Sequence, residues 1–336
     1  MTRRFAFVSF LALAPFALGK GGDVLPWERL KAMYDVAPLT AAQVHTTDRK
    51  AVEGTYVEFD FASEGGGTVY GTFVRPNAKG PFPLAVLFHG LGGSSADMVS
   101  QFAKPLLARG VAVLALDAPH HGQRATQQDR QEFQSTVMRF ATSKDQALGL
   151  GAFMFRDNPE KNSKFAVETI QGGVKDARRA LDWIKSPEYR VDSTQIGVVG
   201  VSLGAIMAAI LSGVDSRIDA DLLIIGGDPV APFLSQLPAD SQAASSAVAS
   251  SLFLPHSTAH VMMLNGYRDT VIPRADTFRL YESAPGATLV FYDTPGDMGH
   301  FFGHSIAPEG YEYGLDWLTK MVAAPKPAER AHTQGR

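Results

Sequence analysis

A serine between two glycines is the residue of this chain best suited to act as a nucleophile. The stretch Gly200-Val201-Ser202-Leu203-Gly204 follows an apolar run at 196–199 and precedes a helical-looking apolar run at 205–211. Strand, G-x-S-x-G and helix in this order are typical of a nucleophile elbow, whose tight turn exposes the serine hydroxyl at the carboxyl end of a sheet. The glycines keep side chains from colliding with the strand and the helix. A glycine-rich turn with an incidental serine would have the same sequence pattern. The assignment therefore depends on whether the chain also contains the catalytic partners of such a serine.

A serine hydroxyl is a poor nucleophile at neutral pH and needs a base, usually histidine, that a carboxylate orients. Asp269 follows an apolar run at 261–264, and His300 follows a second run at 287–292. Both therefore lie in loops after strands, in the order Ser, Asp, His. These loops open on the same edge of a parallel sheet as Ser202, where such sheets bind ligands. We expect Ser202, Asp269 and His300 to form a catalytic triad, although a capping aspartate and a structural loop histidine are the alternatives.

His304 competes with His300 for the role of base. It lies only four residues later, in Phe301-Phe302-Gly303-His304. We favour His300 because it directly follows the loop after the strand, whereas His304 lies toward the next helix.

The chemistry also needs two hydrogen-bond donors for the negative oxygen of a tetrahedral intermediate. The apolar strand at 84–88 is followed by His89-Gly90-Leu91-Gly92-Gly93-Ser94-Ser95, a glycine-rich loop whose amides can point into a cavity. We expect the backbone amides of Leu91 and Leu203 to form the oxyanion hole, and the His89 side chain to shape the loop. A plain glycine-rich turn before the helix at 95–108 is the alternative.

Taken together, these motifs resemble the α/β-hydrolase superfamily, over about Val57 to Met321. Within it, the chain is most similar to the branch of dienelactone hydrolases, acetyl xylan esterases and prolyl-oligopeptidase-like enzymes. The resemblance is carried by Phe88-His89-Gly90, the stretches at 116–122, 176–183 and 265–269, the motif around Ser202, and Gly299-His300. It implies Ser202 as nucleophile, Asp269 as orienting acid, His300 as general base, and no cofactor. The chain departs from the family at Ala205, where a further glycine is frequent, and in a His-Gly-Leu-Gly oxyanion loop; these departures leave the substrate subclass open.

The first residues are typical of a signal peptide. Arg3 and Arg4 precede a short apolar run at 5–18, and Ala17-Leu18-Gly19 offers small residues for cleavage. The run is too short for a comfortable membrane span. We therefore expect export to the periplasm or the medium after removal of residues 1–19, with an uncleaved anchor and twin-arginine export as alternatives. The chain has no cysteine, and therefore no disulfide.

The composition is that of an ordinary soluble domain, with 336 residues, 45% hydrophobic and 19% charged. Loss of two arginines with residues 1–19 would change the formal charge from −3 to −5, which argues against a nucleic-acid partner. No later apolar run is long enough to span a bilayer. We expect one hydrolase domain over 20–325 and a flexible tail at 326–336, rich in Pro, Ala and charge.

Alternating strands and helices predict a mostly parallel sheet with helices on both faces, the α/β-hydrolase fold. An antiparallel hairpin at 56–61 and 68–74 is expected at its edge, since both runs alternate at period two. The further strands are expected at 84–88, 111–116, 196–201, 222–225, 261–264 and 289–292, and helices at 27–36 and 173–184.

Two stretches, at about 123–171 and 229–255, exceed what the sheet requires. Long insertions at this edge are often lids, and the apolar run at 148–155 could narrow an acyl pocket; a self-contained surface subdomain is the alternative. His120-His121 beside Asp117 invites a metal interpretation, but no third residue has zinc-ligand spacing, so we expect no metal.

The sequence therefore predicts an exported serine hydrolase, most simply a carboxylic ester hydrolase that forms an acyl-enzyme. Its substrate would be a small-molecule or polysaccharide-linked ester. A serine peptidase or amidase of prolyl-oligopeptidase type is the first alternative, weakened because the chain is too short to carry a β-propeller. A non-catalytic binding protein on the same fold is the second, weakened because the triad is complete.

Overall fold

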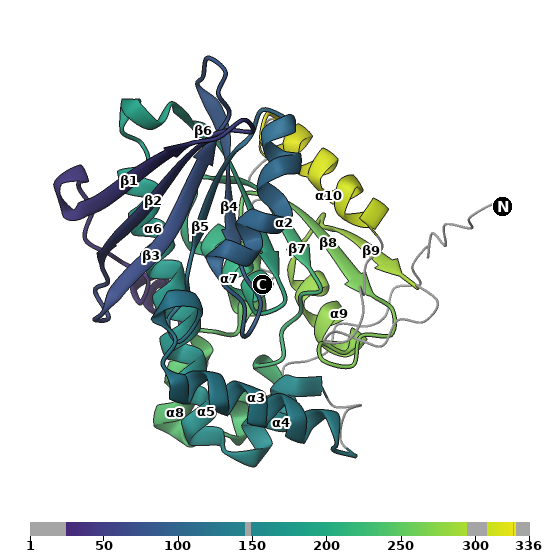
Figure 1. The fold of residues 1–336 in the computed structure, drawn as a ribbon. Helices are drawn as coiled ribbons and strands as arrows, with labels where there is room; N and C mark the ends of the chain where they lie inside the picture. The colour runs from purple at the N-terminus through teal and green to yellow at the C-terminus, as the bar shows by residue number, and fades with distance from the viewer. Residues whose placement is uncertain (1–24, 145–148, 294–307, 325, 327–336) are drawn as a thin grey trace.

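The computed structural model describes residues 25–144, 149–293, 308–324 and 326. Within them, nine strands form one sheet in the order β1-β2-β3-β5-β4-β6-β7-β8-β9 (Figure 1). Strands β1 to β3 and the β3–β5 pair are antiparallel, and all other neighbours are parallel. The strands are β1 Val44–Lys50, β2 Thr55–Ala62, β3 Thr68–Arg75, β4 Phe82–Phe88, β5 Ala112–Leu116, β6 Val191–Val201, β7 Ile218–Ile224, β8 His260–Gly266 and β9 Thr288–Tyr292.

Helices cover both faces of the sheet, and each face has its own apolar core. On one face, α1 (Trp27–Ala32), α6 (Gly172–Trp183) and α7 (Leu203–Val214) pack on strand residues such as Val86 and Val198. On the other, α2 (Ser95–Ala108) and α10 (Pro308–Met321) pack on residues such as Leu87 and Val199. Burial on both faces explains why the parallel strands have continuous apolar runs rather than alternating ones. The predicted α/β-hydrolase architecture is confirmed.

The predicted hairpin is confirmed as the antiparallel pair β2–β3, but its place at the edge of the sheet was wrong. Strand β1 pairs with β2 along its whole length and forms that edge. All residues of β1 after Val44 are exposed, and its sequence, VHTTDRK, has no apolar alternation. A strand that buries no side chain leaves no periodic signal in a sequence, because the signal is made by burial.

Two long insertions leave the sheet where the parallel strands end. The first, between β5 and α6, contains α3 (Gln127–Ala141), α4 (Gly149–Asp157), α5 (Pro159–Ala166) and a π-helical turn at Val167–Gln171. The second, between β7 and β8, contains α8 (Ala239–Ser246) and short 3₁₀ turns. Helices α3, α4, α5 and α8 gather together at one end of the molecule (Figure 1), and α5 packs against α8.

Several expectations fall outside the described residues. Residues 1–19, the predicted signal peptide, and 327–336, most of the predicted tail, are among those not described. In the part of the chain that is described, no helix has both the length and the apolar character needed to cross a membrane.

Candidate active site

Ser202 occupies a strained turn between β6 and α7. Its backbone has φ 56° and ψ −114°, a conformation that L-residues rarely adopt and that costs on the order of 1–3 kcal/mol. The Ser202 amide donates to the Ile224 carbonyl at 2.9 Å, which ties the turn to the neighbouring strand β7. The side chain is 9% exposed. The elbow expected from the sequence is therefore present in the backbone.

The two flanking glycines are required by close approach of the backbone. A methyl group added at Gly204 would lie 2.1 Å from the Phe88 carbonyl oxygen, and one at Gly200 would lie 2.2 Å from the Gly204 carbonyl oxygen. Real side chains do not approach backbone atoms so closely, so only glycine allows α7 to begin directly beneath the end of β4.

The predicted oxyanion loop lies against this serine. A methyl group added at Gly90 would lie 3.5 Å from the Ser202 Cβ, so the loop after β4 and the elbow are in contact distance. Among the residues that the structure describes, neither the Leu91 amide nor the Leu203 amide donates to a backbone or side-chain acceptor. Two unused donors beside the serine are what an oxyanion hole requires.

His89 holds the loop from within the core. Its Nδ1 donates to the Gly90 carbonyl at 2.8 Å, and its Nε2 accepts from the Ala118 amide at 3.1 Å. The Gly93 amide donates to the same Gly90 oxygen at 3.0 Å. In a trans peptide the C=O and the following N–H point in opposite directions, so fixing the Gly90 carbonyl also fixes the direction of the Leu91 N–H. Burial lowers the pKa of His89 and favours the neutral tautomer that this arrangement needs.

The loop after β5 is organised around a buried carboxylate. Asp117 accepts from the Ser95 amide at 2.7 Å and from the Gln123 amide at 2.8 Å. Gly122, at φ +54°, leaves no room for a side chain, because a methyl group there would lie 2.2 Å from the Asp117 carboxyl carbon. This Asp117–Gly122 loop is one of the motifs behind the family resemblance. Its carboxylate holds the start of α2, directly after the predicted oxyanion loop.

The two histidines of this loop have separate surroundings. His120 contacts the carboxylates of Asp129, at 3.1 Å, and Glu168, at 3.4 Å. His121 is buried, its Nδ1 donates to the Pro119 carbonyl at 2.8 Å, and burial lowers its pKa to about 4. Within the described ranges, no three His, Cys, Asp or Glu side chains are arranged to hold a metal ion.

Asp269 stands in the loop after β8, as expected, and is 6% exposed. Its Oδ1 accepts from the amides of Val271, at 2.8 Å, and Ile272, at 2.9 Å. Two backbone donors on one oxygen fix the plane of the carboxylate. His300 and its competitor His304 lie outside the described residues, so the base of the expected triad stays a prediction.

The first insertion packs on both loops of the candidate site. Phe153 and Leu150 of α4 form a buried cluster with Phe140 of α3 and with Val271 and Ile272, and Leu91 packs against this cluster. The Leu150 amide donates to the Val271 carbonyl at 3.0 Å. The insertion therefore bridges the oxyanion loop and the Asp269 loop.

The apolar run at 148–155 was expected to narrow an acyl pocket. Its described residues differ in whether they are buried in the insertion or line a cavity. Phe153 is buried in the cluster just described, whereas Met154 lines the cavity beside the oxyanion loop. The Phe155 side chain lies outside the part of the chain that the structure describes.

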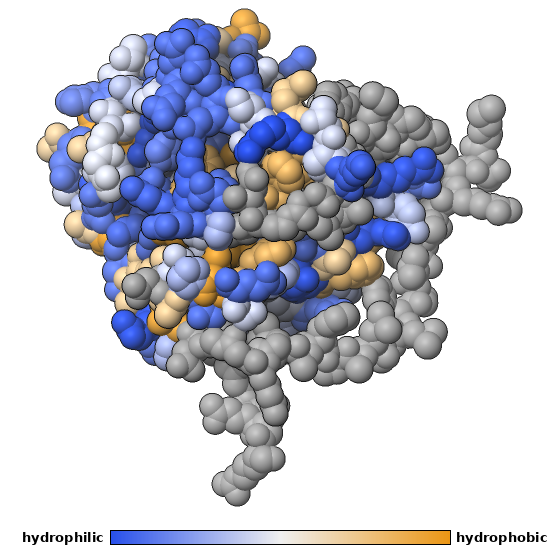
Figure 2. Space-filling view, turned by 90° about the horizontal axis from the view of Figure 1, so that it is seen from below, coloured by the Kyte–Doolittle hydropathy of each residue, from blue (hydrophilic) through white to orange (hydrophobic). Residues whose placement is uncertain are grey.

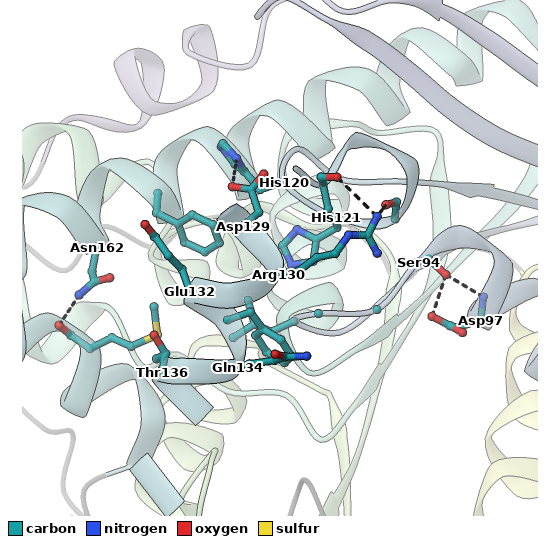
Figure 3. A pocket seen from close by; sticks show the side chains of 18 of the residues that line it. Ser94, Asp97, His120, His121, Asp129, Arg130, Glu132, Gln134, Thr136 and Asn162 are labelled. Atoms are coloured by element: carbon teal, nitrogen blue, oxygen red, sulfur yellow. Dashed lines mark hydrogen bonds and ion pairs between the residues drawn. The ribbon is translucent and has the colours of Figure 1, made fainter. Parts of the chain in front are cut away.

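A cavity of about 390 Å³ lies between the oxyanion loop, the Asp117–Gly122 loop and the helices α3 and α5 (Figure 3). Leu91 and Gly92 line it, together with Phe133 of α3 and Phe165 of α5. Sequence reasoning did not single out these two phenylalanines, because each stands in a mainly polar helix that has the pattern of a surface element. Their shared role depends on the packing of two helices.

The chain shares sequence and fold with known hydrolases. The model of the Alpha/beta hydrolase family matches residues 85–330. Esterase FrsA of Escherichia coli O1:K1 is 30% identical over 103 residues, which are 31% of this chain and 23% of that protein. The chain thus matches only about a quarter of the length of that relative.

Solved structures of esterases have a similar fold. A cold-adapted esterase from an Arctic intertidal metagenomic library has a TM-score of 0.56 at 20% identity, over 82% of this chain and 97% of its own. Acetyl xylan esterase 1 from Thermoanaerobacterium sp. has a TM-score of 0.59 at 13% identity, over 88% of this chain and 99% of its own. At such identities the likeness concerns the fold, and the family match covers well over half of the chain. This protein belongs to the alpha/beta hydrolase family.

Proposed function

We propose that the protein is an exported carboxylic ester hydrolase that works through Ser202, His300 and Asp269 and a covalent acyl-enzyme. The observation that carries the proposal is the strained Ser202 turn, with the unused Leu91 and Leu203 amides beside it. Strain is retained where the surrounding structure fixes it, and such positions cluster at active sites. Membership of a hydrolase family and the fold shared with esterases point to the same chemistry.

In the first half of the reaction, Ser202 Oγ attacks the ester carbonyl carbon while His300 accepts the hydroxyl proton. The carbonyl oxygen becomes negative and is held by the Leu91 and Leu203 amides. The tetrahedral intermediate then collapses, and the bond to the alcohol oxygen breaks. His300 returns the proton to that oxygen, and the alcohol leaves behind an acyl-serine.

In the second half, water takes the place of the alcohol. His300 removes a proton from water, and the hydroxide adds to the acyl-serine. The second intermediate then collapses, the bond from the acyl carbon to Ser202 Oγ breaks, His300 returns the proton to Oγ, and the carboxylic acid leaves. Asp269 stabilises the imidazolium in both halves. Two backbone amides hold its Oδ1 and thereby orient the carboxylate.

The decisive test is Ser202→Ala. Loss of the nucleophile should lower kcat on a p-nitrophenyl acetate substrate by at least ~10⁴-fold while the thermal midpoint changes little, because the side chain does chemistry rather than packing. A fluorophosphonate probe should label Ser202 alone, and Ser100→Ala, at an exposed serine of α2, should retain both labelling and activity. An active Ser202→Ala enzyme, or labelling of another serine, would contradict the triad.

Export is tested separately, by expressing the full chain in a Gram-negative bacterium and determining the N-terminus of the product. The proposal expects a soluble periplasmic or extracellular protein that begins near Lys20. An uncleaved chain that stays with the membrane fraction would instead support an anchor.

A further inference from the structure

The position of the cavity beside the oxyanion loop indicates which part of an ester substrate would occupy it. Leu91 belongs both to this loop and to the cavity wall, whereas Ser202 is not among the lining residues described. Gly90 precedes Leu91, and a methyl group added there would lie 3.5 Å from the Ser202 Cβ. A group bonded to a carbonyl held at the Leu91 amide therefore enters the cavity along the Leu91 side chain.

The strand order indicates which half of the ester this is. Strand β6, which directly precedes Ser202, has β4 and β5 on one side and β7 and β8 on the other. Asp269 follows β8, so the base that links Ser202 to Asp269 must act from the β8 side, and the alcohol that it protonates leaves on that side. The cavity lies on the opposite side, at the ends of β4 and β5. The substituent that points away from the leaving group is the acyl group.

The inner wall of the cavity offers rings and soft apolar atoms. Phe133 packs on Gly92, where an added methyl group would lie 2.4 Å from its ring, so this ring stands next to the oxyanion loop. Phe165 lies 5.4 Å from the His120 ring, between centroids, and Met154 adds a thioether. Aromatic rings and methionine sulfur both contact aromatic ligands favourably.

The charged groups of the wall have hydrogen-bond or ion-pair partners within the protein. Glu132 pairs with Lys161 at 2.9 Å, and Asp129 pairs with His120 at 3.1 Å. Arg130 turns to the Gly122 carbonyl at 3.2 Å (Figure 3), and neutral His121 adds no charge. Asp97, the remaining lining carboxylate, accepts from the Ser94 hydroxyl at 2.7 Å. Because each of these charged groups already has a hydrogen-bond or ion-pair partner within the protein, the cavity favours an uncharged ligand.

The cavity is polar where it adjoins a second cavity of about 330 Å³ between α3 and α5. Thr136 and Asn162 line both cavities, as do Glu132 and Lys161. The Asn162 amide nitrogen donates to the Met154 carbonyl at 2.7 Å, which directs this side chain (Figure 3). Seen from the end at which α3, α4, α5 and α8 gather in Figure 1, the coloured surface is largely hydrophilic, with apolar areas among the polar groups (Figure 2).

We infer that this cavity is the acyl pocket, and that it takes an aromatic acyl group with an uncharged hydrogen-bonding substituent at its far end. The inference rests on the proposed function, since it names the substrate of the same site. Phe133 and Phe165 contact the ring, and Thr136 serves the distal substituent. A volume of about 390 Å³ is in the range of small-molecule pockets, roughly 300–1,000 Å³, and far exceeds the need of an acetyl group.

The test varies the acyl group and keeps the alcohol constant. Methyl acetate, methyl hexanoate, methyl cinnamate and methyl 4-hydroxycinnamate are compared by kcat/KM. We expect the two aromatic esters to exceed the acetate and the hexanoate at least tenfold. Phe133→Ala and Phe165→Ala should lower the aromatic values at least tenfold and the acetate value less than threefold. Phe133→Leu serves as the second variant if the alanine protein does not fold.

Thr136→Val, which has the same shape, should remove the preference for the 4-hydroxy ester over the plain cinnamate. Met138→Ala is the matched control, because Met138 lies on the same helix, is 61% exposed and lines neither cavity. It should leave all four values unchanged.

Three results would overturn the inference: an acetate value equal to the aromatic ones, a hexanoate value above them, or a parallel fall of all esters in both phenylalanine variants. Calorimetric binding of methyl 4-hydroxycinnamate to Ser202→Ala, weakened by Phe133→Ala, gives a readout without turnover. If fluorophosphonate labels Ser202 and methyl acetate is hydrolysed while the aromatic preference is absent, only the acyl-pocket inference fails. If Ser202 is not labelled, the proposed function fails first.

Discussion

Replacing His89 by phenylalanine would separate the shape of this side chain from its hydrogen bonds. The ring would still fill the site, which is 1% exposed, but both nitrogens would be lost. The Ala118 amide would then have no partner, which costs about 1–3 kcal/mol for a buried donor. The Gly90 carbonyl would keep its bond from the Gly93 amide, so it would be loosened rather than freed. We therefore expect the free energy of unfolding to fall by about 1–3 kcal/mol.

His89→Phe should also affect catalysis, because the Gly90 carbonyl that His89 holds sets the direction of the Leu91 N–H. Complete loss of one oxyanion donor lowers kcat by about 10²–10³. Since Gly93 still holds the carbonyl, we expect His89→Phe to lower kcat by about 10–10²-fold, with KM changing less than about threefold. A positioning role acts in the transition state and so appears in kcat, whereas general loosening of the pocket would raise KM.

The assay measures kcat and KM on a p-nitrophenyl acetate substrate, together with urea unfolding of the same protein. His45→Phe is the control, because that histidine lies on the exposed strand β1. Unchanged kcat in a destabilised His89→Phe protein would refute the reasoning, since Gly93 alone would then be sufficient to orient the peptide. An increase confined to KM would refute it equally.

Further predictions concern the base, the elbow and the core. His300→Gln should abolish acyl transfer and His304→Gln should not, and the wild-type rate should rise with pH through one ionisation near the histidine value of ~6.5; the reverse pattern in the two variants would make His304 the base. Gly204→Ala should give insoluble or inactive protein, because the added methyl group would lie 2.1 Å from the Phe88 carbonyl oxygen; a soluble, active variant with an unchanged melting temperature would contradict this. Burial raises the pKa of Asp221 from 3.8 to about 8, so this carboxyl ionises at a lower pH in the unfolded chain than in the folded one. The free energy of unfolding should therefore fall as the pH rises from about 4 to 8. Asp221→Asn removes this loss of stability, which is at most about 4 kcal/mol at pH 7, but leaves a buried amide group without an acceptor. We expect the free energy of unfolding, measured by urea unfolding, to rise by about 1–3 kcal/mol at pH 7 and not to rise at pH 4.

Local sterics and burial on both faces of the sheet made much of this protein readable from its sequence. The elbow at Ser202 was predicted because glycines flank the serine of a strand-to-helix turn. The clash that excludes a side chain at Gly200 is local, with the Gly204 carbonyl, whereas the clash at Gly204 is with the distant Phe88 carbonyl. The parallel strands were predicted because burial on two faces demands continuous apolar runs. Asp269 was predicted to follow a strand, and it does; the place of His300 remains a prediction.

Tertiary structure alone decided the features that depend on contacts between distant residues. His89 is held by Ala118, 29 residues away, and such a partner leaves no mark on the local sequence. Strand β1 buries almost nothing, so only its backbone pairing with β2 identifies it. The cavity arises where Phe133 of α3 and Phe165 of α5 meet the oxyanion loop. Each helix by itself has the sequence of a polar surface element, and only their placement beside the oxyanion loop brings two separate phenylalanines into the wall of one pocket.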